Sequence, residues 1–352
     1  MTSDTEDQYV HETWESPADI IMSYQYTQVD MFSQQMPKDD KYLMSLSIYD
    51  EHNVFLGATT MNENRWTGLF YYYTNLPNSK KDNIATTIEM CSGVSEILVL
   101  DQNRFVVSND DSEIHLYRIE PTEDEKPDLY QVQYRSQENS ILTMSYFTTS
   151  NKLITGGLDC SIRIWDMNDD FNLTHNYANA HTYSVTCVAV DPRGDLRFAS
   201  TSVDGDAIIW DIKDSRPATY IDTKLACELN AVSWKISSDP VIAIGADDGT
   251  VMEFDLRNTQ NALYEHTACS RGISKLLYNL NPECAHQLAC ASYDTTVKVF
   301  DNELQIKLND EQHSDFVTGL AWCKNYLYSC AWDGNLLKHE IAIESIDDDE
   351  SD

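Results

Sequence analysis

Short apolar runs separated by turn residues fill most of the chain. In one stretch, the apolar run 185–190 precedes the turn 191–194, and the run 198–201 precedes the turn 203–206. A third run, residues 207–210, completes the unit. The runs are rich in β-branched side chains and the turns contain Asp, Gly and Pro, as expected for strands joined by tight turns. No stretch sustains a 3.6-residue apolar period with helix caps, so the pattern predicts an all-β protein.

The third run of this unit recurs along the chain. Each copy opens with an Asp, and consecutive copies are 48, 45, 44, 46 and 39 residues apart. The six leading residues are Asp111, Asp159, Asp204, Asp248, Asp294 and Asp333. Residues 66–73, preceded by apolar runs at 42–49 and 54–59, supply a seventh unit. This period is typical of WD repeats, each of which forms one four-stranded blade, so the fold class predicted is a seven-bladed WD40 β-propeller.

The propeller is predicted to occupy residues 20–344. Residues 1–19 and 345–352 are strongly acidic, and such runs are usually disordered. The last repeat leaves too few residues for an outer strand. We therefore expect residues near 20–26 to supply that strand and close the ring, which would remove open sheet edges.

Several polar residues recur with the blades and indicate a structural role. WD repeats often link His, Ser or Thr, Asp and Trp by hydrogen bonds within one blade. The fourth blade has the whole set: His181, Ser200, Asp204 and Trp210. The seventh blade has His313, Ser329 and Asp333, with His339 in place of Trp. The third blade has Thr155, Asp159 and Trp165 but no evident His. Because the spacing repeats with the blades, a hydrogen-bond network is favoured over an acid/base dyad.

The charge balance favours basic partners. The chain has 58 acidic and 24 basic residues, for a net charge of −34. A field of this sign repels nucleic acid and anionic lipid and attracts Arg- or Lys-rich tails, although the acidity could also serve solubility alone. The sequence has no apolar run long enough for a membrane span and no signal-peptide pattern. Its nine cysteines lack a CxxC pair and read as reduced thiols. These features predict a cytoplasmic and nuclear protein.

Catalytic motifs are absent from the sequence. It contains no GxSxG elbow, HExxH helix, or Walker or Rossmann glycine loop. The cysteine spacings do not fit a zinc knuckle. A propeller enzyme with a site in the central channel would need clustered acids, bases or metal ligands, and no such cluster is evident. We therefore predict no catalytic residue, no metal and no cofactor.

Two features favour contact with other proteins. Trp66 lies in the segment Asn64-Arg65-Trp66-Thr67, just before a third strand, where a blade loop reaches the disc surface. A large indole there is a candidate anchor for a partner, with packing into its own blade as the alternative. In the tail, Ser345 and Ser351 lie among acidic residues. They are candidate phosphorylation sites of an acid-directed kinase, unless the tail is merely solvating.

The order of certain motifs resembles one WD-repeat family. The matching pieces are Phe55-Leu-Gly-Ala-Thr-Thr60, Arg65-Trp66-Thr-Gly68, Ala180-His181 with Val185-Thr-Cys-Val-Ala189, Gly249-Thr-Val251, His313-Ser-Asp-Phe-Val317 and Trp332-Asp-Gly334. They resemble the methylosome protein 50 family, called Valois in insects, whose members are WD-repeat partners of protein arginine methyltransferase 5. The resemblance covers roughly residues 42–343.

This resemblance implies a non-catalytic scaffold subunit. In the family, the propeller docks on the N-terminal barrel domain of the methyltransferase, and a loop Trp of the first blade, matched here by Trp66, fills a pocket. Four heterodimers form a hetero-octamer that symmetrically dimethylates arginines in basic histone and Sm-protein tails. Many relatives have Arg two residues before this Trp, whereas this chain has Asn64 there and Arg65 next to the Trp, which puts any contact of that Arg in doubt.

An alternative function is that of a substrate receptor in a cullin-type ubiquitin ligase. Residues 242–257 resemble the motif that many such propellers use, with Phe254 in place of the usual Trp. Recovery of the ligase adaptor, and not of a methyltransferase, from a pull-down would favour this alternative.

Overall fold

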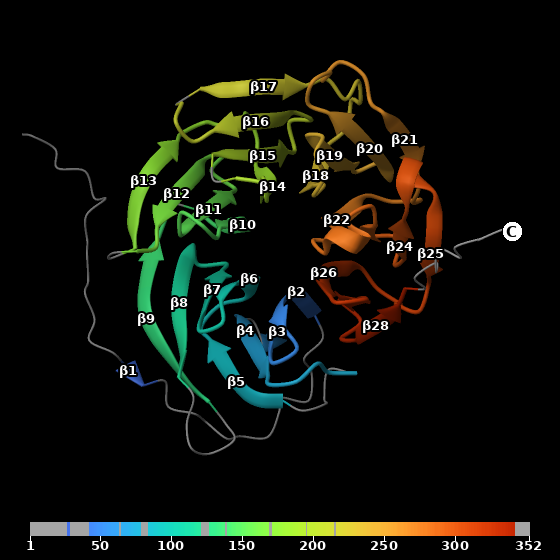
Figure 1. Ribbon diagram of the computed structural model, residues 1–352. Coiled ribbons are helices and arrows are strands. Elements are labelled where there is room, and N and C mark those ends of the chain that lie inside the picture. The colour runs from blue at the N-terminus through green and yellow to red at the C-terminus, as the bar shows by residue number, and fades with distance from the viewer. Residues whose placement is uncertain are drawn as a thin grey trace, which may run out of the picture.

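Seven antiparallel sheets form a closed ring (Figure 1). The computed structural model describes residues 27–28, 42–62, 65–78, 84–120, 127–137, 139–168, 171–194, 196–214 and 216–341. The described residues contain strands β1–β28 and two short 3-10 turns, η1 (Pro282–Cys284) and η2 (Asn302–Leu304). The predicted all-β, seven-bladed propeller is confirmed. No helix within these ranges is long and apolar enough to cross a membrane.

Each blade is a meander whose strands follow the chain from the centre outward. Blades one and two contain β2 (Tyr42–Asp50), β3 (Asn53–Asn62), β4 (Arg65–Tyr73), β5 (Ile84–Met90), then β6 (Val94–Asp101), β7 (Arg104–Asn109), β8 (Glu113–Glu120) and β9 (Asp128–Ser136). Blades three and four contain β10 (Ile141–Phe147), β11 (Lys152–Gly157), β12 (Ile162–Asp166), β13 (Asn172–Tyr177), then β14 (Val185–Val190), β15 (Arg197–Ser202), β16 (Ala207–Asp211) and β17 (Pro217–Ile221).

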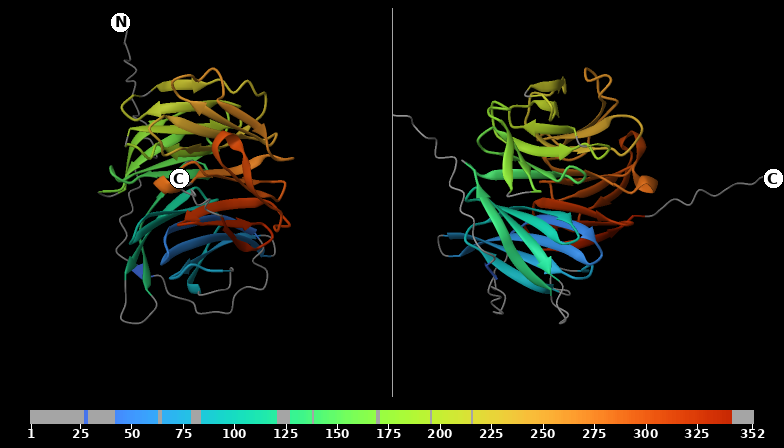
Figure 2. Two further views of the ribbon diagram at one scale, coloured as in Figure 1. Left: turned by 45° about the vertical axis from the view of Figure 1, so that its right-hand side comes forward. Right: turned by 60° about the vertical axis from the view of Figure 1, so that its left-hand side comes forward.

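The remaining blades continue this order around the ring, which Figure 2 shows from two further sides. Blades five and six contain β18 (Leu229–Trp234), β19 (Val241–Ala246), β20 (Thr250–Asp255), β21 (Tyr264–Thr267), then β22 (Ile273–Tyr278), β23 (Leu288–Ser292), β24 (Val297–Phe300) and β25 (Ile306–Asp310). Blade seven contains β26 (Val317–Cys323), β27 (Tyr326–Ala331) and β28 (Leu336–Glu340).

Neighbouring blades are joined by apolar packing and by side chains of the inner strands. Ile154 of blade three, for example, belongs to one buried cluster with Val188 and Trp210 of blade four. Thr143 Oγ1 also accepts a hydrogen bond from the backbone N–H of Val188 at 3.1 Å. Ser145 Oγ accepts one from Val190 N–H at the same distance. These hydroxyl groups satisfy buried backbone donors between blades, which fixes the position of each inner strand against the next.

The predicted closure of the ring by residues near 20–26 stays a prediction. Residues 20–26 lie outside the described residues, and the described part of blade seven is three-stranded. The described N-terminal strand, β1 (Thr27–Gln28), pairs with β9 of blade two, whose outer edge offers unpaired backbone groups. Blades seven and one meet through their inner strands, where Thr318 Oγ1 donates to the carbonyl oxygen of Leu43 at 2.7 Å.

The inner strands surround a central cavity of about 460 Å³. Lys275 of β22 and Glu96 of β6 form an ion pair across it, with 2.6 Å between Nζ and Oε1. The backbone N–H of Met144 also donates to the Glu96 carboxylate. The cavity therefore contains one neutralised pair, and the described residues include no group of three or more His, Cys, Asp or Glu side chains arranged to hold a metal ion.

Candidate protein-binding surface

Trp66 lies on an extended hairpin at the edge of blade one. The structure places it inside β4, paired with Met61 of β3, and not in a loop before the strand as the sequence had suggested. The β3–β4 pairing includes nine residue pairs, against five between the equivalent strands of blade four, so the hairpin reaches beyond its blade. The indole is 49% exposed. It is therefore not packed fully into its own sheet.

The other residues predicted beside Trp66 differ in position. Thr67 is half-buried in β4 and faces Thr60 across the pair of strands. The backbone of Arg65 pairs with that of Asn62. Asn64 lies outside the described residues, as do Ser345 and Ser351 of the acidic tail. Their predicted roles in partner binding and phosphorylation stay predictions.

Trp66 is the end of a continuous row of rings from three blades. Its ring centre lies 6.0 Å from that of Tyr42, which lies 5.4 Å from Trp332. Trp332 lies 5.2 Å from Phe316, and Phe316 lies 5.3 Å from Tyr293. We call these five residues the aromatic ridge. Only Trp66 among them is exposed by more than about a third. Tyr42 contacts it directly, the other rings continue the row behind Tyr42, and aromatic pairs of this kind add roughly 0.5–1.5 kcal/mol each to area burial.

The ridge lies on one face of the disc, which we call the upper face. This face is formed by the loops between the second and third strands of the blades and by the loops that enter the inner strands. Trp332 and Tyr293 belong to the first kind of loop, and Phe316 and Arg271 to the second. The Arg271 guanidinium lies 5.7 Å from the centre of the Phe316 ring, within the range of a cation–π contact. Arg271 thus lies beside the ridge at Phe316.

The upper face is strongly acidic. In blades two to seven, the described loops between second and third strands contain no Lys or Arg. Their acidic residues are Asp110, Asp111, Asp159, Asp204, Asp206, Asp247, Asp248, Asp294 and Asp333. Some of these carboxylates are neutralised locally; Asp159, for example, pairs with Arg163 at 2.7 Å. The exposed remainder gives this face a negative potential that extends over roughly a Debye length, about 8 Å at physiological ionic strength.

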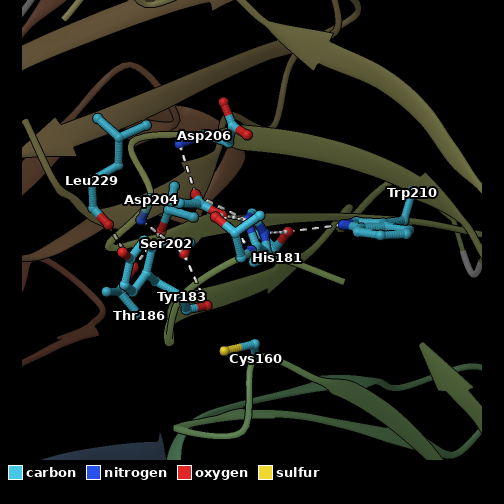
Figure 3. Close-up of polar contacts among 12 residues, drawn as sticks. Cys160, His181, Tyr183, Thr186, Ser202, Asp204, Asp206, Trp210 and Leu229 are labelled. Carbon is cyan, nitrogen blue, oxygen red and sulfur yellow. Dashed lines mark hydrogen bonds and ion pairs between the residues drawn. The ribbon is translucent and has the colours of Figure 1, made fainter. Parts of the chain in front are cut away.

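The predicted polar set of blade four is one hydrogen-bonded chain (Figure 3). Trp210 Nε1 donates to Ser200 Oγ at 2.8 Å. Ser200 Oγ lies 2.7 Å from His181 Nε2, and His181 Nδ1 lies 3.1 Å from Asp204 Oδ2. Neutral His181 satisfies this geometry if it accepts at Nε2 and donates at Nδ1. The chain joins the two loops of the blade on the upper face, and the His181 side chain has no contact with solvent, so the arrangement is structural.

The ionisation of this set follows from its burial. Burial lowers the pKa of His181 below its usual value, and the nearby Asp204 opposes this only in part. Burial alone would raise the pKa of Asp204, but the backbone N–H groups of Asp206 and Thr182, together with His181, lower the pKa below its usual value. Neutral imidazole beside carboxylate is therefore the resting state at neutral pH.

Blade seven contains a variant of the network with two histidines. His313 lies 3.1 Å from Asp333 and 2.8 Å from Ser329 Oγ. His339 takes the place of Trp, with Nε2 2.8 Å from Ser329 Oγ and Nδ1 3.2 Å from Asp310 Oδ2. The second ring nitrogen of His339 needs a hydrogen-bond partner, which Asp310 supplies. An indole has no second nitrogen and would not need one.

Blade three contains a member of the set that the sequence pattern does not reveal. Trp165 Nε1 donates to Thr155 Oγ1 at 3.1 Å, and Thr155 Oγ1 donates to Gln137 Oε1 at 3.2 Å. Gln137 therefore replaces the absent His. It precedes Thr155 by 18 residues, and His181 precedes Ser200 by 19, so the spacing could have identified Gln137 if amides had been considered.

Comparisons with known proteins agree with the fold. The family described as WD domain, G-beta repeat matches residues 130–166 and 172–211. The chain is 27% identical over 298 residues to Methylosome protein WDR77 from Xenopus laevis, an alignment that covers 83% of this chain and 87% of that protein. It is 22% identical over 213 residues to the Peroxisomal targeting signal 2 receptor from Schizosaccharomyces pombe, covering 58% of this chain and 66% of that protein. The predicted resemblance to the methylosome protein family is thereby confirmed.

Proposed function

We propose that this seven-bladed WD-repeat propeller, which is similar to Methylosome protein WDR77, is a non-catalytic scaffold subunit that binds a type II protein arginine methyltransferase. Similarity to that relative over most of both chains supports the general role. The observation that carries the proposal is the aromatic ridge, because it holds a half-exposed indole rigidly on an acidic face. The catalytic subunit would be protein arginine methyltransferase 5, as the family resemblance implies.

The ridge supplies an anchor of suitable strength. A tryptophan side chain has about 200 Å² of surface, and Trp66 leaves roughly half of it accessible. Covering about 100 Å² corresponds to a gross gain of about 2.5 kcal/mol at 25 cal/mol per Å². This is the scale of an interface hot spot. Because Tyr42 and the rings behind it already position the indole, little conformational entropy would be lost on binding.

The finer features of the proposed complex rest on the family resemblance. Trp66 would enter a pocket in the N-terminal barrel domain of the methyltransferase, and four heterodimers would form a hetero-octamer. The acidic upper face would help present basic Arg-rich tails of histones or Sm proteins, and it disfavours direct contact with nucleic acid or an anionic membrane. Such an assembly would act in both cytoplasm and nucleus.

Replacement of Trp66 by Ala tests the anchor. We expect Trp66→Ala to weaken binding to the purified methyltransferase at least tenfold, a loss of about 1.4 kcal/mol or more. The matched control is Tyr220→Ala on β17 of blade four, where a similarly exposed aromatic ring is removed far from the ridge. Titration calorimetry measures both, and unchanged thermal unfolding shows that the variants are folded.

Normal affinity of the Trp66→Ala chain for the enzyme would contradict the anchor. The wild-type chain alone should transfer no methyl group to a histone H4 peptide. A pull-down that recovers the ligase adaptor, and not a methyltransferase, would favour the ubiquitin-ligase alternative. Arg257 of its motif already binds Asp239 and Asp255 of the same chain, so the structure gives that alternative no added support.

A further inference from the structure

A second apolar patch lies on the upper face over blades three and four. Tyr183 is 63% exposed, Leu158 43% and Leu142 39%. We call these three residues the Tyr183 patch. Blades three and four lie across the ring from blades seven and one, which hold most of the aromatic ridge (Figure 1). The two surfaces are therefore separate, and binding of a partner at the aromatic ridge does not explain the exposed side chains of the Tyr183 patch.

Backbone hydrogen bonds hold the loops of the patch side by side. The N–H of Leu158 donates to the carbonyl oxygen of Ser140 at 3.0 Å. The N–H of His181 donates to the carbonyl oxygen of Cys160 at 3.2 Å. The loop 158–161 of blade three is thus bonded to the loop before Leu142 and to the loop that contains Tyr183. The patch is one surface built from two blades.

Hydrogen bonds fix the backbone around Tyr183 (Figure 3), although its ring is exposed. Ser202 Oγ donates to the Tyr183 carbonyl oxygen at 3.2 Å. Thr182 N–H donates to Asp204 Oδ2 at 2.8 Å, and Val203 N–H donates to the carbonyl oxygen of Ser184 at 3.1 Å. The hydrogen-bonded chain of blade four therefore supports this loop. A ring presented on a fixed backbone binds at a smaller entropic cost than one on a mobile loop.

The charges around the patch determine what it can bind. Asp206 is exposed in the next loop of blade four, and Asp110 and Asp111 are exposed in the loop of blade two. That loop is bonded to blade three, because Ser140 Oγ donates to the Asp110 carbonyl oxygen at 2.8 Å. In blade three, the cation of the third strand, Arg163, is neutralised by Asp159. The patch is thus apolar at its centre and anionic at its rim.

Arginine has the chemistry that matches this combination. Its planar guanidinium stacks on aromatic faces and forms paired hydrogen bonds with carboxylates. Its methylene stem covers apolar surface such as Leu142 and Leu158. Lysine matches the charge, but its compact ammonium is more strongly hydrated and gains less from stacking. A second copy of this chain is an unsuitable occupant, because each copy has a net charge of −34.

We propose that the Tyr183 patch docks an extended, arginine-rich protein segment, with a guanidinium on the Tyr183 ring and the Asp206 carboxylate beside it. The inference rests on the proposed function only for the biological identity of the segment, a substrate tail of the methyltransferase. The binding of an arginine-rich segment is inferred from the side chains and charges of the Tyr183 patch.

Binding of a labelled peptide of alternating Gly and Arg to the full-length chain tests the proposal. Fluorescence anisotropy gives its affinity, and the same peptide with Lys in place of Arg serves as the matched probe. We expect the Lys peptide to bind at least threefold more weakly and Tyr183→Ala to weaken binding of the Arg peptide about fivefold. Tyr183→Phe should retain most of the affinity, and Tyr220→Ala should leave it unchanged.

Three results would overturn the proposal. They are equal binding of the two peptides, unchanged affinity of the Tyr183→Ala chain, and equal losses in the Tyr183→Ala and Tyr220→Ala chains. Asp206→Asn is a second variant; it should weaken binding at low salt and make little difference at high salt, since screening removes the contribution of an exposed charge.

The Trp66→Ala chain separates this proposal from the role of the ridge. It should bind the Arg peptide normally while losing affinity for the methyltransferase, and Tyr183→Ala should do the reverse. Loss of peptide binding in the Trp66→Ala chain would place the segment on the ridge and overturn the Tyr183 patch. Normal methyltransferase binding by that chain would contradict the ridge alone.

Discussion

The hydrogen bonding of the indole N–H group distinguishes the tryptophans that stabilise the blades from Trp332 on the upper face. Four of the described tryptophans donate to an acceptor in the same chain: Trp165, Trp210, Trp234 and Trp322. The indole nitrogen of Trp332 is buried without a hydrogen-bond partner among the described residues. An unpaired buried donor costs about 1–3 kcal/mol. The ring position between Tyr42 and Phe316 is thus maintained at the expense of stability.

Replacement of Trp332 by Phe is expected to leave stability unchanged or raise it. The smaller ring loses some contact area, but the unpaired donor disappears. Trp322→Phe is the matched control, because it removes a 2.9 Å hydrogen bond to the Leu277 carbonyl oxygen from a similarly half-buried ring. It should lower the free energy of unfolding by about 1 kcal/mol or more. Urea unfolding compares the two variants, and an equal loss would show that ring size alone matters.

In the turns between second and third strands, a single position can restrict which residue the turn accepts. Gly249 joins β19 to β20 with φ of +86°, and a Cβ there would stand 2.1 Å from the carbonyl oxygen of Cys269. Gly205 occupies the same turn of blade four with φ of +82°, yet the nearest atom to its Cβ, Cys227 O, would be 3.1 Å away. Both turns need a residue in the left-handed backbone conformation. Only in blade five does the glycine also lie in close contact with the backbone of the next loop.

Gly249→Ala should therefore destabilise the protein far more than Gly205→Ala. The left-handed backbone costs either alanine about 1–2 kcal/mol. At Gly249 the backbone of residue 269 must also move, which disturbs the packing of Cys269 against blade six. Chemical denaturation of both variants gives the difference in the free energy of unfolding. Equal losses would mean that backbone conformation alone sets the cost.

At the scale of strands and turns, the sequence predicts the blades well but predicts poorly where a blade departs from the repeat. The recurring Asp and the aromatic residue of each third strand locate that strand, because turn and core positions restrict residue choice. Gln137 was missed because an amide can replace an imidazole in the same geometry. The pairing of β1 with β9 was also missed, since an exposed sheet edge accepts a strand through backbone groups that no side-chain pattern encodes.

For the upper face as a whole, the sequence indicates its charge but not its arrangement. The Asp residues of the loops are evident from the repeats. The contact between Trp66, Tyr42 and Trp332 joins the two ends of the chain, which only closure of the ring brings together. Leu142, Leu158 and Tyr183 likewise form one surface only after blades three and four are packed. The disc thus carries two separate surfaces on one acidic face, which the two proposals assign to an enzyme and to a basic segment.

Stability of the whole molecule should fall as the pH is lowered from about 7.5 to 5.5. Burial lowers the pKa of His115, His181 and His339 below the ordinary value of 6.5. Their contribution is complete above pH 6.5 and is lost below it, because the unfolded chain then binds more protons than the folded one. The lowered pKa values of Asp204, Asp310 and Asp333 act in the same direction, but only as the pH falls below about 3.8.

Two other effects oppose this trend and determine how the experiment is done. The pKa values of Asp110 and Asp206 are raised, chiefly because the surrounding loops partly desolvate these exposed carboxylates and because Asp111 and Asp204 lie nearby, so these residues favour the folded state as the pH falls toward 3.8. Acid also relieves the repulsion that a net charge of −34 imposes. Thermal unfolding at high ionic strength screens that repulsion and leaves the contribution of the buried histidines.

Replacement of His181 by Gln isolates the contribution of one histidine. Blade three shows that an amide accepts from the hydroxyl of Thr155 as an imidazole accepts from Ser200, and the amide N–H₂ of residue 181 can still donate to Asp204. Because Gln does not titrate, His181→Gln should fold with a similar melting temperature at pH 7.5 and lose less of it at pH 5.5 than the wild-type chain. An unchanged pH dependence would show that His181 carries no part of the acid sensitivity. A large loss already at pH 7.5 would show that blade four, unlike blade three, requires the imidazole ring.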